Sequence, residues 1–218
     1  MAWEREAPKG IEKPKIALLL PHRGSLPAEF VESIWGPLRH VPLAWCDKVR
    51  FMNRSPSLPL VRNELAQQAL DASCTHFLWV DSDGVMETPP DPNEALRFLY
   101  ECDAPIVACL YRAKQKVGFF NAAWNKVSEG YTPIDSWTGN YFPVDVTGMH
   151  FVLIKREVFE NVPKPWFHWE IGPPSEDFYF YERAKEAGYQ VRIFAEVRLS
   201  HLGDLKVLSD GSVTTRDV

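Results

Sequence analysis

The segment HFLWVDSDGVM, residues 76–86, points to the architecture of the whole chain. Its apolar residues 77–80 predict a buried strand, and this strand runs directly into Asp81 and Asp83, which are separated by one serine. Aspartates that cap the backbone of a turn would account for this pattern. The position of both carboxylates directly after a buried strand favours a role in binding a ligand.

Strands and helices alternate on both sides of this segment. Apolar runs predict further strands at residues 14–21, 49–53 and 104–111. Apolar residues four positions apart predict helices at residues 26–38 and 58–73, and Asp91 before Pro92 is a helix-start signal for residues 91–102. This alternation predicts an α/β fold with a mostly parallel sheet and helices on both faces. Ligands of such sheets bind outside the carboxyl ends of the strands, where the two aspartates lie.

The second half of the chain continues with a different pattern. After a loop-rich, aromatic stretch, residues 144–162 predict a strand followed by a short helix. Residues 176–187 predict another helix, with Ser175 as its N-cap and Gly188 as its C-cap. Apolar residues then alternate with other residues, which predicts a half-exposed strand that ends at His201.

Composition describes an ordinary globular chain with one domain. We predict that residues 15–203 form a catalytic domain between an N-terminal tail, 1–14, and a C-terminal tail, 204–218.

The net charge of −5 gives no general reason to expect nucleic-acid binding. The four cysteines form no C-x-x-C pair, which argues against a zinc or redox motif and fits a cytoplasmic protein. The apolar run IALLL is far too short for a transmembrane segment.

Asp81, Ser82 and Asp83 form a D-x-D motif. Where the chain turns, two carboxylates at this spacing can converge on one cation. Hard oxygen ligands suit Mg²⁺ or Mn²⁺, and either ion could then bridge to a diphosphate.

Two further acids and a histidine are candidates for chemistry. Glu176 and Asp177 begin a predicted helix, where acidic residues complement the helix dipole. A carboxylate in this position could also act as a general base toward a hydroxyl group. His201, at a strand end, is either a surface residue or a metal ligand, and the histidines that compete for this role are His22, His150 and His168.

Basic residues are placed near the same sheet edge. His22 and Arg23 follow the first predicted strand and could contact a nucleotide base or phosphate, or form part of a solvated loop. Arg62, in the helix before the D-x-D strand, could pair with Asp81 or with a phosphate oxygen. Alternatively, Arg62 is an exposed charged residue on the surface of the helix.

The ordered set of motifs resembles a glycosyltransferase of the GT-A fold, closest to the large family-2-like group. The segments that carry this resemblance are RNELAQQAL, THFLWVDSD, VTGMHFVLIKREVF, SEDFYFYERAKEAGYQV and HLG. With the alternating strands and helices that precede them, the resemblance covers roughly residues 15–203. The resemblance implies a Rossmann-like domain, a nucleotide-sugar donor and a divalent cation, Mn²⁺ or Mg²⁺.

The resemblance also implies roles for individual residues. Asp83 would be the main metal ligand, with Asp81 near the metal or the ribose and His201 as a further ligand. Asp177 would be the general base of an inverting transfer, and Glu176 would help to bind a sugar. The donor would contact Pro21, His22, Arg23, Arg62, Asp81, Ser82 and Asp83.

The acceptor side of the implied site includes Gly148 and Met149, which would flank the acceptor pocket. Aromatic faces stack on sugar rings, and the candidates are Trp137, Trp166 and Trp169. The segment WEIGPPSED lacks the Q-x-x-R-W signature of processive synthases. We therefore expect a single transfer rather than polymerisation.

Two other functions remain open at this point. A nucleotidyltransferase of related fold would need a glycine-rich phosphate loop after the first strand, where PHRGSLP has one glycine. A non-catalytic module that binds carbohydrate or nucleotide would keep the aromatic residues. Such a module would not need Asp83, Asp177 and His201 to converge.

Overall fold

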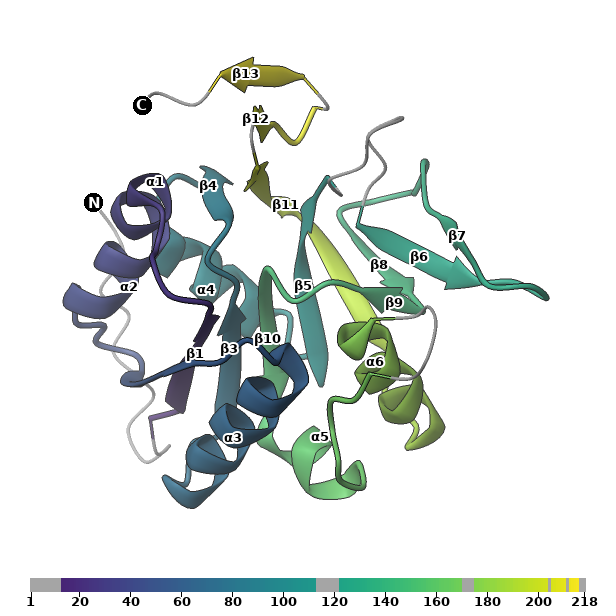
Figure 1. Cartoon of the computed structure of the whole chain (residues 1–218), viewed down its shortest axis with the longest axis horizontal. Helices are drawn as coiled ribbons and strands as arrows, with labels where there is room; N and C mark the ends of the chain where they lie inside the picture. The colour runs from purple at the N-terminus through teal and green to yellow at the C-terminus, as the bar shows by residue number, and fades with distance from the viewer. Residues whose placement is uncertain (1–12, 113–121, 170–174, 204, 211, 216–218) are drawn as a thin grey trace.

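The computed structural model describes residues 13–112, 122–169, 175–203, 205–210 and 212–215, and a 10-stranded sheet lies at its centre (Figure 1). Along the sheet the order is β13 (Val213–Thr215), β12 (Leu205–Val207), β11 (Val191–Leu202), β5 (Ile106–Tyr111), β10 (Phe151–Lys155), β3 (His76–Val80), β1 (Lys15–His22) and β2 (Asp47–Arg54). Two more strands, β4 (Gly84–Thr88) and β8 (Tyr141–Val144), pair with β11. A small second sheet contains β7 (Tyr131–Pro133), β6 (Ala123–Lys126) and β9 (Val146–Thr147).

Strands β1, β2, β3, β5 and β11 run in one direction, and β10 runs against them between β3 and β5. The predicted α/β class with a mostly parallel sheet is therefore confirmed. The reversed strand β10 was not predicted. Its reversal brings the start of β10 to the same edge as the ends of β3 and β5.

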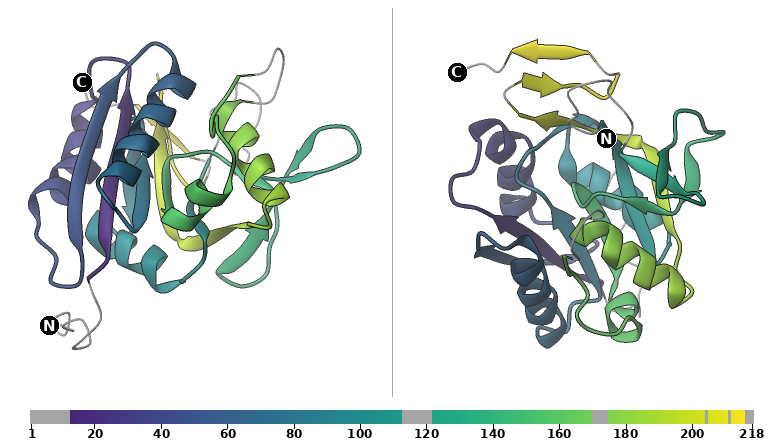
Figure 2. Two further views of the ribbon diagram at one scale, coloured as in Figure 1. Left: turned by 90° about the horizontal axis from the view of Figure 1, so that it is seen from below. Right: turned by 45° about the vertical axis from the view of Figure 1, so that its right-hand side comes forward.

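Helices cover both faces of the sheet (Figure 2). One face packs against α3 (Leu58–Asp71), α5 (Arg156–Asn161) and α6 (Glu176–Glu186). The other face packs against α4 (Pro92–Glu101) and the consecutive segments α1 (Ala28–Phe30), η1 (Val31–Trp35) and α2 (Gly36–His40). The helix predicted at 26–38 thus forms in three parts, with a π-helical turn in its middle.

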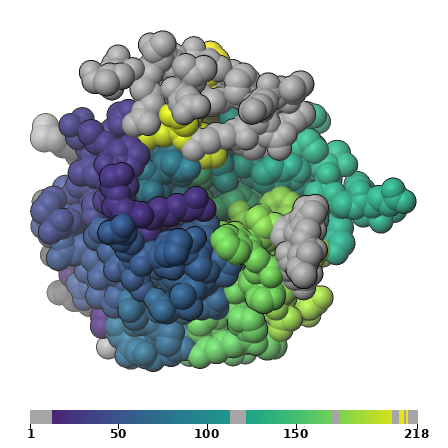
Figure 3. All heavy atoms as spheres, viewed as in Figure 1, coloured from purple at the N-terminus to yellow at the C-terminus, as the bar shows by residue number. Residues whose placement is uncertain are grey.

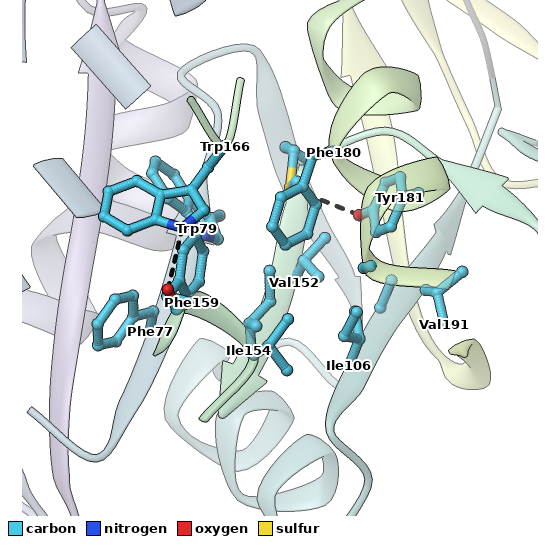
Figure 4. Packing of buried hydrophobic residues seen from close by; sticks show 14 of the residues in the cluster. Phe77, Trp79, Ile106, Val152, Ile154, Phe159, Trp166, Phe180, Tyr181 and Val191 are labelled. Carbon is cyan, nitrogen blue, oxygen red and sulfur yellow. Dashed lines mark hydrogen bonds between the residues drawn. The ribbon is translucent and has the colours of Figure 1, made fainter. Parts of the chain in front are cut away.

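The alternation of side chains along β3 explains how one strand serves both faces. Phe77 and Trp79 belong to the core on the α3 face, whereas Leu78 and Val80 belong to the core on the α4 face. In the first core, Phe77 stacks on Phe159 with ring centroids 4.8 Å apart (Figure 4). A strand that is apolar on both faces in this way must be central, which fixes the position of the aspartates that follow it.

The C-terminal segment 204–218, treated above as a tail, contributes β12 and β13 to the sheet. Residues 1–12 of the predicted N-terminal tail lie outside the described residues. Within the described part of the chain, no helix has the length and apolar character needed to span a membrane.

Candidate functional site

Four titratable side chains gather at the edge where β3, β5 and β11 end. Asp81 follows β3, Asp83 precedes β4, His150 directly precedes β10 and His201 lies near the end of β11. Backbone hydrogen bonds hold these segments together: the Asp81 amide donates to the His150 carbonyl at 3.1 Å, and the Leu202 amide donates to the Asp83 carbonyl at 2.7 Å. In the space-filling view this face is hollowed near its centre, between purple residues of the N-terminal part and green residues of the second half (Figure 3).

Asp83 lies between two histidines. Its Oδ1 is 3.2 Å from His150 Nε2, and its Oδ2 is 3.2 Å from His201 Nε2. One ligand atom from each of the three residues lies within 4.8 Å of the others. Two imidazole nitrogens and a carboxylate oxygen are suitable ligands for a divalent metal ion, so the donor atoms present here fit the cation that the resemblance implies.

Arg62 joins the D-x-D segment to the start of α6. Its guanidinium is 1% exposed, and Nη2 donates to both oxygens of Asp81, at 2.9 and 3.1 Å. Arg62 Nε donates to Glu176 Oε1 at 3.2 Å. Burial raises the pKa of Asp81 above its ordinary value, while the charge of Arg62 acts in the opposite direction. The arginine therefore pairs with two buried carboxylates and partly opposes the effect of burial on the pKa of Asp81.

We expect Arg62→Lys to lower the free energy of unfolding by about 1–3 kcal/mol, because an ammonium group cannot reproduce the hydrogen bonds of the guanidinium to two buried carboxylates. Urea denaturation would measure this change. Arg97→Lys is the matched control, since Arg97 pairs with Glu101 one helical turn away at a more exposed position. A change for Arg62→Lys no larger than that of the control would contradict a structural role for the buried pairs.

Asp177 approaches the same group of residues from α6. Its Oδ1 accepts hydrogen bonds from the Phe178 amide at 2.9 Å and from the Ser175 hydroxyl. A Cβ atom placed on Gly148 would lie 3.5 Å from Asp177 Oδ2 and 1.9 Å from Tyr111 Oη. Asp177, Gly148 and Tyr111 therefore meet at one point.

Tyr111 connects this point to the histidines. Its ring stacks on His150, with centroids 4.1 Å apart, and meets His201 edge-on at 5.6 Å.

Burial raises the pKa of Asp177 to about 6, and the nearby carboxylate of Glu176 adds to the rise. A carboxyl group with a pKa near 6 is well matched to proton transfer close to neutral pH.

The close approach of Tyr111 explains why residue 148 is glycine. We expect Gly148→Ala to lower the free energy of unfolding by about 1–3 kcal/mol, because the added methyl group would overlap the tyrosine hydroxyl. Thermal or urea denaturation would measure the change. Adding Tyr111→Phe removes the overlapping oxygen, so the double variant should recover part of the lost stability. If Tyr111→Phe brings no recovery in the Gly148→Ala background, the overlap is not the cause.

The other residues predicted to bind the donor lie at the same sheet edge. The β1–β3 register sets Leu19 beside Trp79, so both strands end at this edge. Pro21 is buried, and the half-buried His22 hydrogen-bonds through Nδ1 to the Gly24 carbonyl at 3.0 Å. The remaining two predicted contacts are the exposed Arg23 and the half-buried Ser82.

The residues predicted on the acceptor side differ in exposure. Met149 is 1% exposed and its sulfur accepts a hydrogen bond from the Tyr181 hydroxyl, so its side chain belongs to the core. Trp169 is 48% exposed, and its Nε1 donates to Glu176 Oε2 at 3.0 Å. Trp166, in contrast, is 2% exposed and forms part of the core shown in Figure 4, so it presents no face for stacking on a sugar. The ring of Trp137 stacks on Phe142.

Two side chains at the centre of this site were not assigned a role from sequence. From sequence, His150 is one of several histidines that compete with His201, and Tyr111 is the last residue of a predicted strand. The signal for His150 was its position immediately before a buried strand. That signal becomes informative only once β10 is known to run antiparallel.

Comparison with known proteins supports the fold. No protein-family model matches the sequence, and a search of curated proteins finds no relative. The crystal structure of A197 from STIV is similar at a TM-score of 0.65 and 16% identity, covering 94% of this chain and 95% of that one. A structure of GalNAc-T7 with UDP, GalNAc and Mn²⁺ is similar at a TM-score of 0.58 and 12% identity.

The second similarity covers 88% of this chain, which spans 44% of the GalNAc-T7 structure. The apo structure of UDP-glucose pyrophosphorylase matches at a TM-score of 0.47 and 6% identity. At these identities the similarities concern the fold alone. The first two agree with the Rossmann-like GT-A class that the sequence predicts.

Proposed function

We propose that this protein is a metal-dependent glycosyltransferase that moves one sugar from a nucleoside diphosphate sugar to an acceptor hydroxyl. The observation that carries the proposal is the convergence of Asp83, His201 and Asp177 around Tyr111 at the carboxyl edge of the sheet. If the aspartates of the D-x-D motif only capped the backbone of a turn, His201 and Asp177 would have no reason to lie near them. The similarity of fold to a structure of GalNAc-T7 with UDP, GalNAc and Mn²⁺ gives further support.

Asp83 and His201 are the residues that would hold the cation. When bound, a divalent cation would neutralise the charge that develops on the departing diphosphate. The nucleotide would lie toward the end of β1, where His22 and Arg23 can contact its base or phosphates. Arg62 would hold Asp81 in place through its two hydrogen bonds.

Asp177 is the residue that we assign as general base. Its carboxylate takes the proton from the acceptor hydroxyl as that oxygen forms a bond to C1 of the sugar and the bond from C1 to the diphosphate breaks. Direct attack of this kind inverts the configuration at C1. The Tyr111 hydroxyl occupies the space beside Gly148 and lies near this carboxylate, so an acceptor hydroxyl would approach Asp177 next to Tyr111.

Glu176 has a different role from its neighbour. One of its carboxylate oxygens accepts a hydrogen bond from Arg62, and the other accepts one from Trp169. Glu176 is 5% exposed. Both oxygens are thus engaged, so we assign Glu176 to positioning Trp169 and Arg62. The exposed indole of Trp169 would provide the face on which a sugar ring stacks.

Calorimetric titration with UDP-, GDP-, CMP- and dTDP-sugars, each with and without Mn²⁺, tests this proposal. We expect tight binding of one nucleotide class, and only when the metal is present. Release of the free nucleotide in the presence of an acceptor would then distinguish a transferase from a module that only binds. Failure of a folded protein to bind any of these sugars would refute the donor assignment.

A further inference from the structure

We propose that His150 is a third protein ligand of the metal, and that Asp81 is not itself a ligand. The resulting site, Asp83 with His150 and His201, selects Mn²⁺ or Co²⁺ over Mg²⁺. This inference rests on the metal-dependent function proposed above and adds the identity of the cation. It assigns a ligand role to His150, which has none in the D-x-D pattern.

The first support is the placement of the two imidazole rings. His150 Nε2 and His201 Nε2 face different oxygens of Asp83, each at 3.2 Å. Two ligands of one metal at ordinary metal–nitrogen and metal–oxygen distances lie about 3–4 Å apart. The three ligand atoms, all within 4.8 Å of one another, are therefore close to the spacing that a shared cation requires.

The rings are also held in place before any ion binds. His150 is 4% exposed and lies between Tyr111, which stacks on it, and His201, whose ring centroid is 4.2 Å away. A preorganised pair of this kind loses little rotamer freedom when it ligates a metal.

The hydrogen bonding of His201 indicates which ring nitrogen faces the metal. Its Nδ1 lies 3.0 Å from the Arg112 carbonyl oxygen, which can only accept, so Nδ1 carries the proton. In the neutral ring Nε2 then presents a lone pair toward the carboxylate of Asp83. Two such groups face one another stably only if the ring takes up a second proton or a cation lies between them.

Asp81 is engaged elsewhere. Both of its oxygens accept hydrogen bonds from Arg62 Nη2. Its Oδ2 lies 3.9 Å from His150 Nδ1, which is the ring nitrogen that does not face Asp83. This distance is too long for a hydrogen bond, so the geometry places Asp81 near the ring of His150 but gives it no direct contact with the metal-binding nitrogen.

The chemistry of the three ligands determines which cation they prefer. Mg²⁺ favours oxygen ligands and gives up its water reluctantly, so two imidazoles suit it poorly. Affinity of nitrogen-containing sites rises from Mn²⁺ to Co²⁺ and beyond in the divalent series. We therefore expect Co²⁺ to bind more tightly than Mn²⁺, and Mg²⁺ to compete weakly with either.

The test uses the full chain, stripped of metal with a chelator and titrated with Mn²⁺ alone. Pulsed EPR then counts the nitrogen nuclei bound to Mn²⁺, and competition with Mg²⁺ measures selectivity. We expect two nitrogens in the native protein, one in His150→Gln and one in His201→Gln. Asp81→Asn should keep both nitrogens, because Asp81 is not itself a ligand.

His40→Gln is the matched control because His40 is exposed at the end of α2; it should change neither measurement. A single nitrogen in the native protein would overturn the inference, as would Mg²⁺ competing as strongly as Mn²⁺. So would the absence of Mn²⁺ binding in the folded native chain. The native measurements decide the matter even if a variant fails to fold. Mn²⁺ held by two nitrogens in a protein that binds no nucleotide sugar would uphold this inference and refute the transferase function.

Discussion

Asp83→Asn is expected to abolish the metal-dependent binding of the donor and to lower transfer by about 10³-fold. Asp83 supplies the one carboxylate that lies between His150 and His201, and asparagine keeps its shape while removing its charge. A bound cation contributes several kcal/mol of stabilisation to a developing negative charge, and each 1.36 kcal/mol corresponds to a factor of ten in rate. Calorimetry with Mn²⁺ and the identified nucleotide would measure binding, and initial rates of nucleotide release would measure transfer.

Asp103→Asn is a suitable control for this variant. Asp103 is exposed and pairs with Lys155 near the opposite ends of β5 and β10, and asparagine tolerates its positive φ of 48°. The control should retain both donor binding and transfer. If Asp83→Asn bound the donor with the same dependence on Mn²⁺ as the native protein, Asp83 would not be a ligand of the metal.

Local patterns were enough to predict most of the elements. The Asp91 signal, for example, depends on neighbouring residues alone, and the Asp91 side chain accepts a hydrogen bond from the Asn93 amide at 2.9 Å at the start of α4. Ser175 also occupies the predicted N-cap position of α6, but its hydroxyl contacts Asp177 and makes no capping bond. The residue at which a helix begins could thus be predicted more reliably than the hydrogen-bond partner of that residue's side chain.

The features that could not be predicted depend on pairing between distant segments. Nothing in the sequence of β10 sets its direction, because a strand buried on both faces is apolar whether it is parallel or antiparallel. The contact between Arg62 and Glu176 joins residues 114 positions apart. Trp166 and Trp169 lie three positions apart, yet one is 2% exposed and the other 48%. Only packing against α3 and α5 distinguishes such residues, and this packing has no local signature.

Asp177→Asn is expected to lower kcat by about 10²–10⁴-fold, the range typical for loss of a general base, and to leave donor binding unchanged. An asparagine oxygen can still accept from the Phe178 amide and the Ser175 hydroxyl, as the carboxylate does, so the start of α6 should keep its structure. The amide cannot take a proton from an acceptor hydroxyl. Steady-state kinetics with the identified donor and acceptor, combined with donor calorimetry, would separate the two effects.

The pH profile provides a second measure of the same role. Because burial raises the pKa of Asp177 to about 6, the carboxylate is the minor form below pH 6 and the dominant form above it. The rate of the native enzyme should therefore rise with pH through about 6 and then level off, and Asp177→Asn should lack this rise. Glu186→Gln, an exposed acid at the other end of α6, should behave as the native enzyme does. An Asp177→Asn enzyme with native kcat and the native pH profile would exclude Asp177 as the base and leave the proton to another group or to the substrate.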